Sequence, residues 1–111
     1  MIKKTILIDL DGVLNDYNGK YDETYIPPIR KGAYELIQEL SNNYKIVIFT
    51  SRNLLTASKW VIENGLNNYV YNVTNIKEAA YLIIDDRCIN FSGDFEKLKI
   101  DIDEFKTRYK K

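Results

Sequence analysis

The sequence predicts a three-layer α/β domain, in which a mostly parallel sheet lies between flanking helices. Two observations predict this class: short apolar runs, mostly rich in β-branched or aromatic residues, and amphipathic stretches between them. Such runs are too short for helices and are typical of strands buried on both faces. Strands that alternate with helices form right-handed βαβ units, which build parallel sheets. A chain of 111 residues is expected to be a single domain, residues 1–111.

Four apolar runs are expected to form the strands. They lie at residues 6–8, 46–49, 70–73 and 81–84. Residues 12–29 carry Asn18-Gly19 and Pro27-Pro28 and show no helical period. Asn-Gly is typical of hairpin turns, and prolines end regular structure. We therefore expect an irregular, hairpin-like flap after the first strand.

Apolar residues at helical spacing predict the helices. The first set is Ala33, Leu36, Ile37, Leu40 and Tyr44, and the second is Leu54, Ala57, Trp60 and Val61. Asn64-Gly65 is a suitable stop for the second helix. Near the end of the sequence, Asp101 is expected to cap a third helix with Ile102, Phe105 and Tyr109 on its apolar side.

Composition excludes several function classes. The chain has no histidine, which rules out Ser-His-Asp and Cys-His hydrolysis and the common zinc sites. Its single cysteine, Cys88, allows no internal disulfide and suits a reducing compartment. Sixteen basic and sixteen acidic residues give no strong nucleic-acid signal. No apolar stretch approaches the ~20 residues of a membrane span, so we expect a cytoplasmic protein. The oligomeric state stays open.

Polar residues follow three of the four predicted strands. These segments are Asp9-Leu10-Asp11-Gly12, Thr50-Ser51-Arg52 and Asp85-Asp86-Arg87. In Rossmann-like sheets, ligands bind outside the carboxyl ends of the strands, so at least three carboxylates should share one crevice. Carboxylates that lie so close need a cation, and oxygen ligands without His or Cys indicate Mg²⁺.

Asp9 and Asp11 are the first candidates for catalysis. If the strand persists, alternation points both side chains the same way. One carboxylate could then attack a phosphorus atom while the other protonates the leaving oxygen. The alternative is a surface turn or a fragment of a calcium loop, although the apolar Val13 and Leu14 do not fit the calcium pattern.

The other candidates also have structural alternatives. Asp85-Asp86 could be a turn that ends a strand, but adjacent carboxylates there face repulsion and partial desolvation. Thr50 and Ser51 could cap the next helix, as could Asn53. Lys77 alone would be an ordinary surface lysine; its place between the third and fourth strands makes it a candidate.

Together these residues resemble the four motifs of the haloacid dehalogenase-like hydrolase superfamily, whose phosphatases form an aspartyl-phosphate. Asp9-Leu10-Asp11-Gly12-Val13 resembles the first motif, Thr50 the second, Lys77 the third and Asp85-Asp86 the fourth. The motifs occur in the family's order and span residues 5–87. The Ile-Asp-Asp-Arg form of the fourth motif is similar to that of small bacterial members with poorly defined substrates.

The resemblance implies a role for each residue. Asp9 would be the nucleophile, and Asp11 the general acid and then the general base. Thr50 and Lys77 would bind the phosphoryl group, with Ser51 and Arg52 as further substrate contacts. Mg²⁺ would be held by the Asp9 side chain, the Asp11 main-chain carbonyl and Asp86 directly, with Asp85 bound through water.

The intervals between the motifs leave no room for the cap domain that sets the substrate in many family members. The substrate is therefore a phosphorylated molecule of unknown class. The alternatives are an open site for a large phosphorylated partner, a site closed by another subunit, and a small pocket formed by the flap tyrosines, Tyr17, Tyr21 and Tyr25. The resulting hypothesis is a Mg²⁺-dependent phosphomonoester hydrolase. The alternatives are a non-catalytic phosphate- or metal-binding domain of the same fold, and a phosphotransferase.

Overall fold

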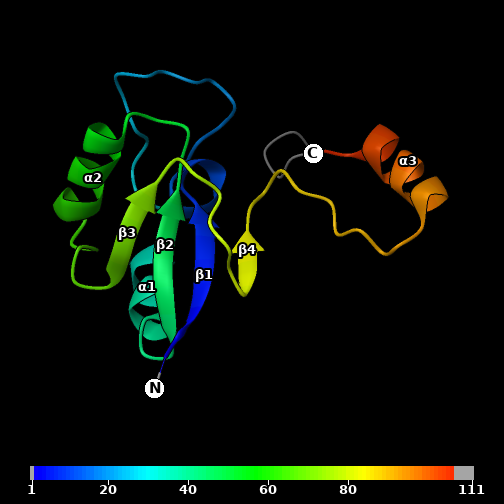
Figure 1. The fold of residues 1–111 in the computed structure, drawn as a ribbon. Coiled ribbons are helices and arrows are strands. Elements are labelled where there is room, and N and C mark those ends of the chain that lie inside the picture. Colours follow the sequence, from blue (N-terminus) through cyan, green and yellow to red (C-terminus); the bar gives the residue numbers. More distant parts are fainter. Residues whose placement is uncertain (1, 107–111) are drawn as a thin grey trace.

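The computed structural model describes residues 2–106, which contain one four-stranded parallel sheet in the order β3-β2-β1-β4 (Figure 1). The strands are β1 (Lys4–Asp9), β2 (Tyr44–Phe49), β3 (Val70–Thr74) and β4 (Leu82–Ile84). All three strand pairs are parallel. The α/β class with flanking helices is confirmed, and the described residues contain no cap domain. None of the helices in this part of the chain is long and apolar enough to cross a membrane.

The core lies between the two central strands and two helices, α1 (Ala33–Leu40) and α2 (Leu54–Glu63). Alternate residues of β1 and β2 point toward these helices because side chains in a strand alternate between faces. The apolar cluster on that face includes Ile6, Ile8, Ile46 and Ile48 from the strands and Ile37, Ala57, Trp60 and Val61 from the helices. Burial of this cluster fixes the sheet beneath the functional residues.

Burial on both faces was predicted for all four strands, which is right for β1 and β2 and wrong for β3 and β4. On β4, Leu82 and Ile83 are 39% and 43% exposed. The reason lies in the crossover from β3 to β4, residues 75–81, which passes back over the sheet as a loop rather than as a helix (Figure 1). A loop covers less of a sheet face than a helix, so the outer strands stay partly exposed.

The two predicted central helices are present, with one change of boundary. Tyr44, predicted as part of the first helix, is instead the first residue of β2. The backbone N–H groups of Asn42 and Asn43 bond to carbonyls of the last turn of α1, which closes the helix before the strand begins. The helix α2 ends at Asn64-Gly65 as predicted, where Gly65 has a φ of 72°.

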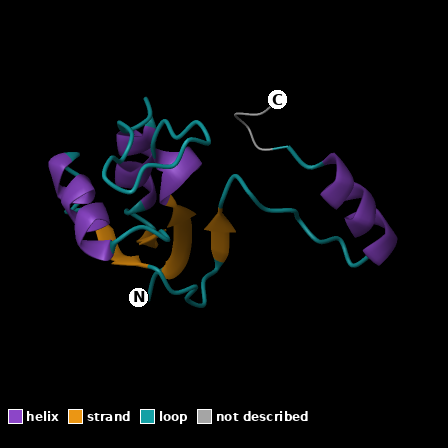
Figure 2. Ribbon diagram, turned by 90° about the horizontal axis from the view of Figure 1, so that it is seen from above, coloured by secondary structure: helices purple, strands orange, loops and turns teal. Residues whose placement is uncertain are grey.

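The third helix, α3 (Phe95–Glu104), begins earlier than predicted. Its cap is Asp94, whose side chain accepts the N–H groups of Glu96 and Lys97. The predicted cap, Asp101, instead lies within the helix and pairs with Lys97 at 2.6 Å. Tyr109 lies outside the described residues. The helix stands apart from the sheet in both views, and none of its ten residues, all described, is buried (Figures 1 and 2).

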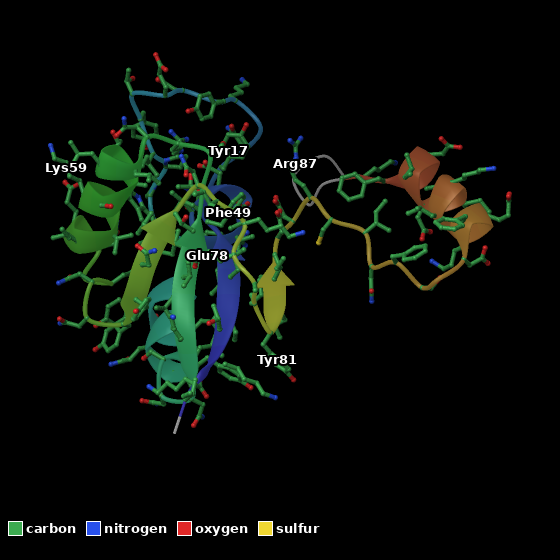
Figure 3. All side chains as sticks on the ribbon, viewed as in Figure 1. Tyr17, Phe49, Lys59, Glu78, Tyr81 and Arg87 are labelled. Atoms are coloured by element: carbon green, nitrogen blue, oxygen red, sulfur yellow. The ribbon has the colours of Figure 1, made fainter. Side chains whose placement is uncertain are left out.

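The irregular flap predicted at residues 12–29 is present, but residues 12–14 belong to a short helical turn, η1 (Leu10–Leu14), so the flap occupies residues 15–31. An antiparallel bridge between Asn15 and Ile29 closes its base. Asp16 N–H donates to the Pro28 carbonyl, and Arg30 N–H donates to the Leu14 carbonyl, each within 3.0 Å. The indole N–H of Trp60 on α2 donates to the Pro27 carbonyl at 3.1 Å. These bonds set the flap over the carboxyl ends of the strands, where Tyr17 is labelled in Figure 3.

Candidate active site

Three carboxylates meet at the carboxyl ends of β1 and β4. Asp9 is the last residue of β1, and Asp85 and Asp86 follow β4 directly. Because Ile8 pairs with Ile84 in the parallel ladder, the next residues of both strands emerge side by side. One carboxylate oxygen from each aspartate lies within 4.8 Å of the others, and all three residues are half-buried. The structure therefore brings together three of the four predicted metal ligands through their side chains.

This crowding changes the acidity of Asp9. Burial, followed by the negative charges of Asp85, Asp86 and Asp11, raises the pKa of Asp9 from 3.8 to about 8. The Leu10 N–H bonds to the carboxylate and opposes the shift only in part. Without a cation beside it, Asp9 would thus be mainly protonated at neutral pH. Oxygen donors at this spacing suit Mg²⁺, which prefers carboxylate ligands.

The chain turns sharply after Asp9 through a short irregular helical turn, η1 (Leu10–Leu14). Gly12 has a φ of 88°, a conformation that other residues rarely adopt. A Cβ atom at this position would collide with the Asp86 carboxylate. Glycine is thus required here both for the turn and for the close approach of Asp86 to the backbone.

Asp11 is held differently from the other three aspartates. Its carboxylate accepts two bonds from Arg52 Nε, at 2.8 and 3.1 Å, and one from Asn15 Nδ2 at 3.0 Å. Arg52 is only 3% exposed, so this ion pair is shielded from water. The Asp11 side chain is thereby held apart from the three-carboxylate cluster. Its main-chain carbonyl, the predicted ligand, is a separate group.

The hydroxyl candidates follow β2. Thr50 is 2% exposed, and its N–H bonds to the Thr74 carbonyl on β3. Its Oγ1 accepts the Arg52 N–H at 3.0 Å, which leaves the hydroxyl proton available for a ligand. Ser51 is exposed beside it. Neither residue caps α2, because Asn53 does so by accepting the N–H groups of Leu55 and Thr56.

Lys77 is the predicted site residue on the segment between β3 and β4. It is exposed on the crossover between β3 and β4. Among the described residues it forms no ion pair with the carboxylate cluster.

Asn15 was missed by the sequence reasoning. It is completely buried, and its Oδ1 accepts the N–H groups of Gly12 and Tyr17, both at 3.1 Å. The same side chain donates to Asp11. In the sequence, Asn15 is simply an amide residue directly after the apolar pair Val13-Leu14, and this pattern does not predict its contacts.

The flap adds a second set of contacts to Arg52. Its Nη1 donates to the Asp22 carbonyl at 2.9 Å, and the guanidinium carbon lies 4.7 Å from the centre of the Tyr21 ring. A cavity of about 460 Å³ is lined by flap residues, among them Lys20, Tyr21, Tyr25 and Pro27. The predicted tyrosine pocket thus has a counterpart in the structure that includes Tyr21 and Tyr25.

Comparisons with known proteins identify a family and a similar fold. A family model described as NLI interacting factor-like phosphatase matches residues 4–68, more than half of the chain, from β1 to just beyond α2. A solved structure, that of a conserved protein from Bacteroides thetaiotaomicron, is similar in fold, with a TM-score of 0.63 and 23% identity. The alignment covers 96% of this chain and 94% of that one. No curated protein matches the sequence significantly.

Proposed function

Because the chain belongs to the NLI interacting factor-like phosphatase family, a family of haloacid dehalogenase-like phosphatases, we propose that it is a Mg²⁺-dependent phosphomonoester hydrolase with Asp9 as its nucleophile. The observation that supports this most is the arrangement of four aspartates. Three of them gather around one point, and the fourth, Asp11, is held apart by Arg52 and Asn15. A nucleophile beside a metal site and a separately oriented acid are what phosphoryl transfer from an ester requires.

The proposed reaction has two steps. An Asp9 oxygen forms a bond to phosphorus while the bond from phosphorus to the leaving oxygen breaks, and Asp11 gives its proton to that oxygen. The carboxylate of Asp11 then takes a proton from water. The resulting hydroxide attacks the phosphorus, breaks the bond to Asp9 and releases inorganic phosphate. Asp9 and Asp11 thereby return to their starting states.

The phosphoryl oxygens need donors, and we assign them to residues that follow β2 and β3. The Thr50 hydroxyl retains a proton that it can donate. Ser51 and the Nη2 group of Arg52 are further donors on the same segment. Lys77, exposed on the crossover, would add its charge once a phosphoryl group is bound, since the structure offers its ammonium group no other anion among the described residues.

The residues present fit a magnesium ion. In the proposal, Asp9, Asp86 and the Asp11 carbonyl would hold it, and Asp85 would support it from beside them. The close approach of Asp86 to Gly12 and the raised pKa of Asp9 both support a cation at this point. When bound, the ion supplies positive charge that keeps Asp9 ionised and offsets charge on the transferring phosphoryl group. A cytoplasmic location and a single functional domain, residues 1–111, are part of the same proposal.

The test uses p-nitrophenyl phosphate, a general phosphatase substrate, with Mg²⁺ and without an added acceptor. Asp9→Asn keeps the shape of the side chain but removes the attacking charge, so activity should fall about 1,000-fold or more. Lys59→Ala, on the outer side of α2, is the matched control and should keep full activity (Figure 3). More than about a tenth of normal turnover in Asp9→Asn contradicts the nucleophile assignment. Turnover only with an added acceptor indicates a phosphotransferase.

A second measurement needs no substrate. Beryllium trifluoride mimics a phosphoryl group on aspartate, and a ligand at a hundredfold excess over its Kd stabilises the folded state by about 2.7 kcal/mol. The melting temperature should then rise by about 10 °C, since the domain is small. The rise should require Mg²⁺ and fluoride together and should vanish in Asp9→Ala. An equal rise in Asp9→Ala would place the ligand elsewhere.

A further inference from the structure

We propose that Arg52 is a positioning residue that couples the flap, residues 15–31, to the orientation of Asp11. The guanidinium orients the carboxylate for proton transfer only while it also holds the flap closed over the site. This inference rests on the proposed function, because it assigns Asp11 the role of general acid. It adds to that function a link through which substrate binding, by keeping the flap closed, also keeps Asp11 oriented.

The first support is the set of donors to the Asp11 carboxylate. Arg52 and Asn15 supply all three hydrogen bonds that it accepts from the described residues. Each donor also binds the backbone of the flap. Arg52 donates to the Asp22 carbonyl, and Asn15 accepts the Tyr17 N–H. The acid is thus oriented entirely through residues that also hold the flap.

The second support is the strength of the Arg52 contact. Among the three ion pairs of the described residues, only the Arg52–Asp11 pair is shielded, while Lys97–Asp101 and Lys99–Glu96 lie at the surface. Separating a buried pair leaves an uncompensated charge, which is far more costly than loss of a surface pair. The Tyr21 ring over the guanidinium adds a cation–π contact from the flap itself. The Arg52 guanidinium therefore holds both the Asp11 carboxylate and the flap.

The third support is an unused donor. Arg52 Nη2 is buried and bonds to none of the described residues, although its Nε and Nη1 groups are both engaged. A buried donor of this kind is costly unless a partner arrives. A phosphoryl or leaving-group oxygen of a bound substrate would supply that partner. Substrate binding would then stabilise the same arrangement that closes the flap and aims Asp11.

A coupling role predicts a dependence on the leaving group. An acidic leaving group such as p-nitrophenol departs with little help from a general acid, whereas an alkyl alkoxide needs its proton. Damage to Arg52 should therefore slow alkyl phosphates, such as ethyl phosphate, far more than p-nitrophenyl phosphate. A residue that only binds the phosphoryl group would affect both substrates equally, because they share that group.

The kinetic experiment compares Arg52→Lys, Asp11→Asn and the double variant, with Lys59→Ala as control, on both substrates with Mg²⁺. Arg52→Lys keeps the charge but loses the forked donors. We expect kcat for ethyl phosphate to fall about 100-fold and kcat for p-nitrophenyl phosphate to fall less than about tenfold, within the range of general acid catalysis. The double variant should be no slower than Asp11→Asn, because both act through one group. Equal losses on both substrates, or a rise in KM alone, would overturn the proposal.

Tyr21→Ala provides a milder variant in case Arg52→Lys does not fold. Tyr21 is exposed and lies with its ring over the Arg52 guanidinium, so the fold should survive removal of the ring. The loss should have the same leaving-group dependence, at about two- to fivefold for ethyl phosphate, as expected for one cation–π contact. Equal effects on the two substrates would contradict the coupling.

A proteolysis assay tests the coupling without any activity. Lys20 lies in the exposed part of the flap, and trypsin cleavage after it can be followed by mass spectrometry. Arg52→Lys and Asp11→Asn should both speed this cleavage about fivefold or more, while Lys59→Ala should not, because opening of a segment governs its cleavage. Unchanged cleavage in Asp11→Asn would overturn the coupling. If the protein hydrolyses no phosphoester, the proposed function fails, yet this assay still decides whether Asp11 and the flap are linked.

Discussion

The segment from β1 to β3 and the segment that follows it differ sharply in packing. Every buried residue among those described lies at or before residue 74. The core comes from β1, β2 and the helices α1 and α2. After residue 74 come the crossover loop, the three-residue strand β4 and the isolated helix α3. Stability therefore resides in the first segment, which is also where the family model matches.

The candidate site joins these two unequal segments. Asp9, Asp11, Thr50 and Arg52 come from the well-packed part, whereas Asp85 and Asp86 follow β4, which is held to the rest of the sheet by its pairing with β1. The carboxylates that complete the metal site thus sit on the less buried part of the fold. A cation shared by Asp9 and Asp86 would tie the two segments together, which links metal binding to the order of β4.

The largest effect should come from removing a core side chain. Ile48→Ala on β2 deletes a fully buried group, so the free energy of unfolding should fall by about 2–5 kcal/mol. Ile83→Ala on β4, where the side chain is 43% exposed, should cost less than about 1 kcal/mol. Urea denaturation of both variants measures the difference. Similar losses would show that β4 is packed as tightly as β2, and the contrast between the segments would fail.

A smaller effect should come from the charge of Asp9. Its pKa is raised in the folded protein, so its contribution to stability is present below pH 4 and is lost as pH rises toward 8. Without Mg²⁺, the free energy of unfolding should therefore fall across this range. One pKa unit corresponds to about 1.4 kcal/mol, and after allowance for solvent screening we expect Asp9→Asn to be more stable by about 1–2 kcal/mol at pH 8. Denaturation at pH 4 and pH 8 tests this.

Two controls sharpen that measurement. At pH 4 the wild type and Asp9→Asn should have equal stability, because the Asp9 carboxyl is then largely protonated in the folded protein. Added Mg²⁺ should stabilise the wild type at pH 8 and have less effect on the variant. Equal pH dependence in both proteins would mean that neither burial nor the nearby negative charges raise the pKa of Asp9.

Features that depend on chain topology could be predicted from the sequence. The runs at 6–8 and 46–49 consist of apolar residues that favour strands, and they form the two central strands. Once the strands are parallel, their carboxyl ends share one edge, so Asp9 and Asp85-Asp86 had to meet. The flap was predictable because Asn18-Gly19 and Pro27-Pro28 disfavour regular structure.

Features that depend on what covers a surface could not be predicted. The apolar run at 81–84 looks like a buried strand, but its burial depends on the crossover, which forms no helix. Asp94 and Asp101 are equally suitable N-cap residues by type, and only the structure shows that α3 begins after Asp94. The pairing of Arg52 with Asp11 links residues 41 positions apart through side-chain geometry that no local pattern contains.

The smallest effect should come from α3. Ile102 is 58% exposed, and no residue of the helix is buried, so Ile102→Ala removes little apolar area from contact. The free energy of unfolding should change by less than about 0.5 kcal/mol, as for other surface substitutions. Urea denaturation of Ile102→Ala and of Ile37→Ala, which lies on the buried face of α1, measures the two losses of unfolding free energy.

A second measurement is amide exchange. Because a ten-residue helix is marginal in water on its own, the amides of α3 should exchange rapidly with deuterium. A loss above about 2 kcal/mol, or slow exchange in residues 95–104, would show that α3 docks in solution and contributes to the core, which would remove the contrast between the two segments.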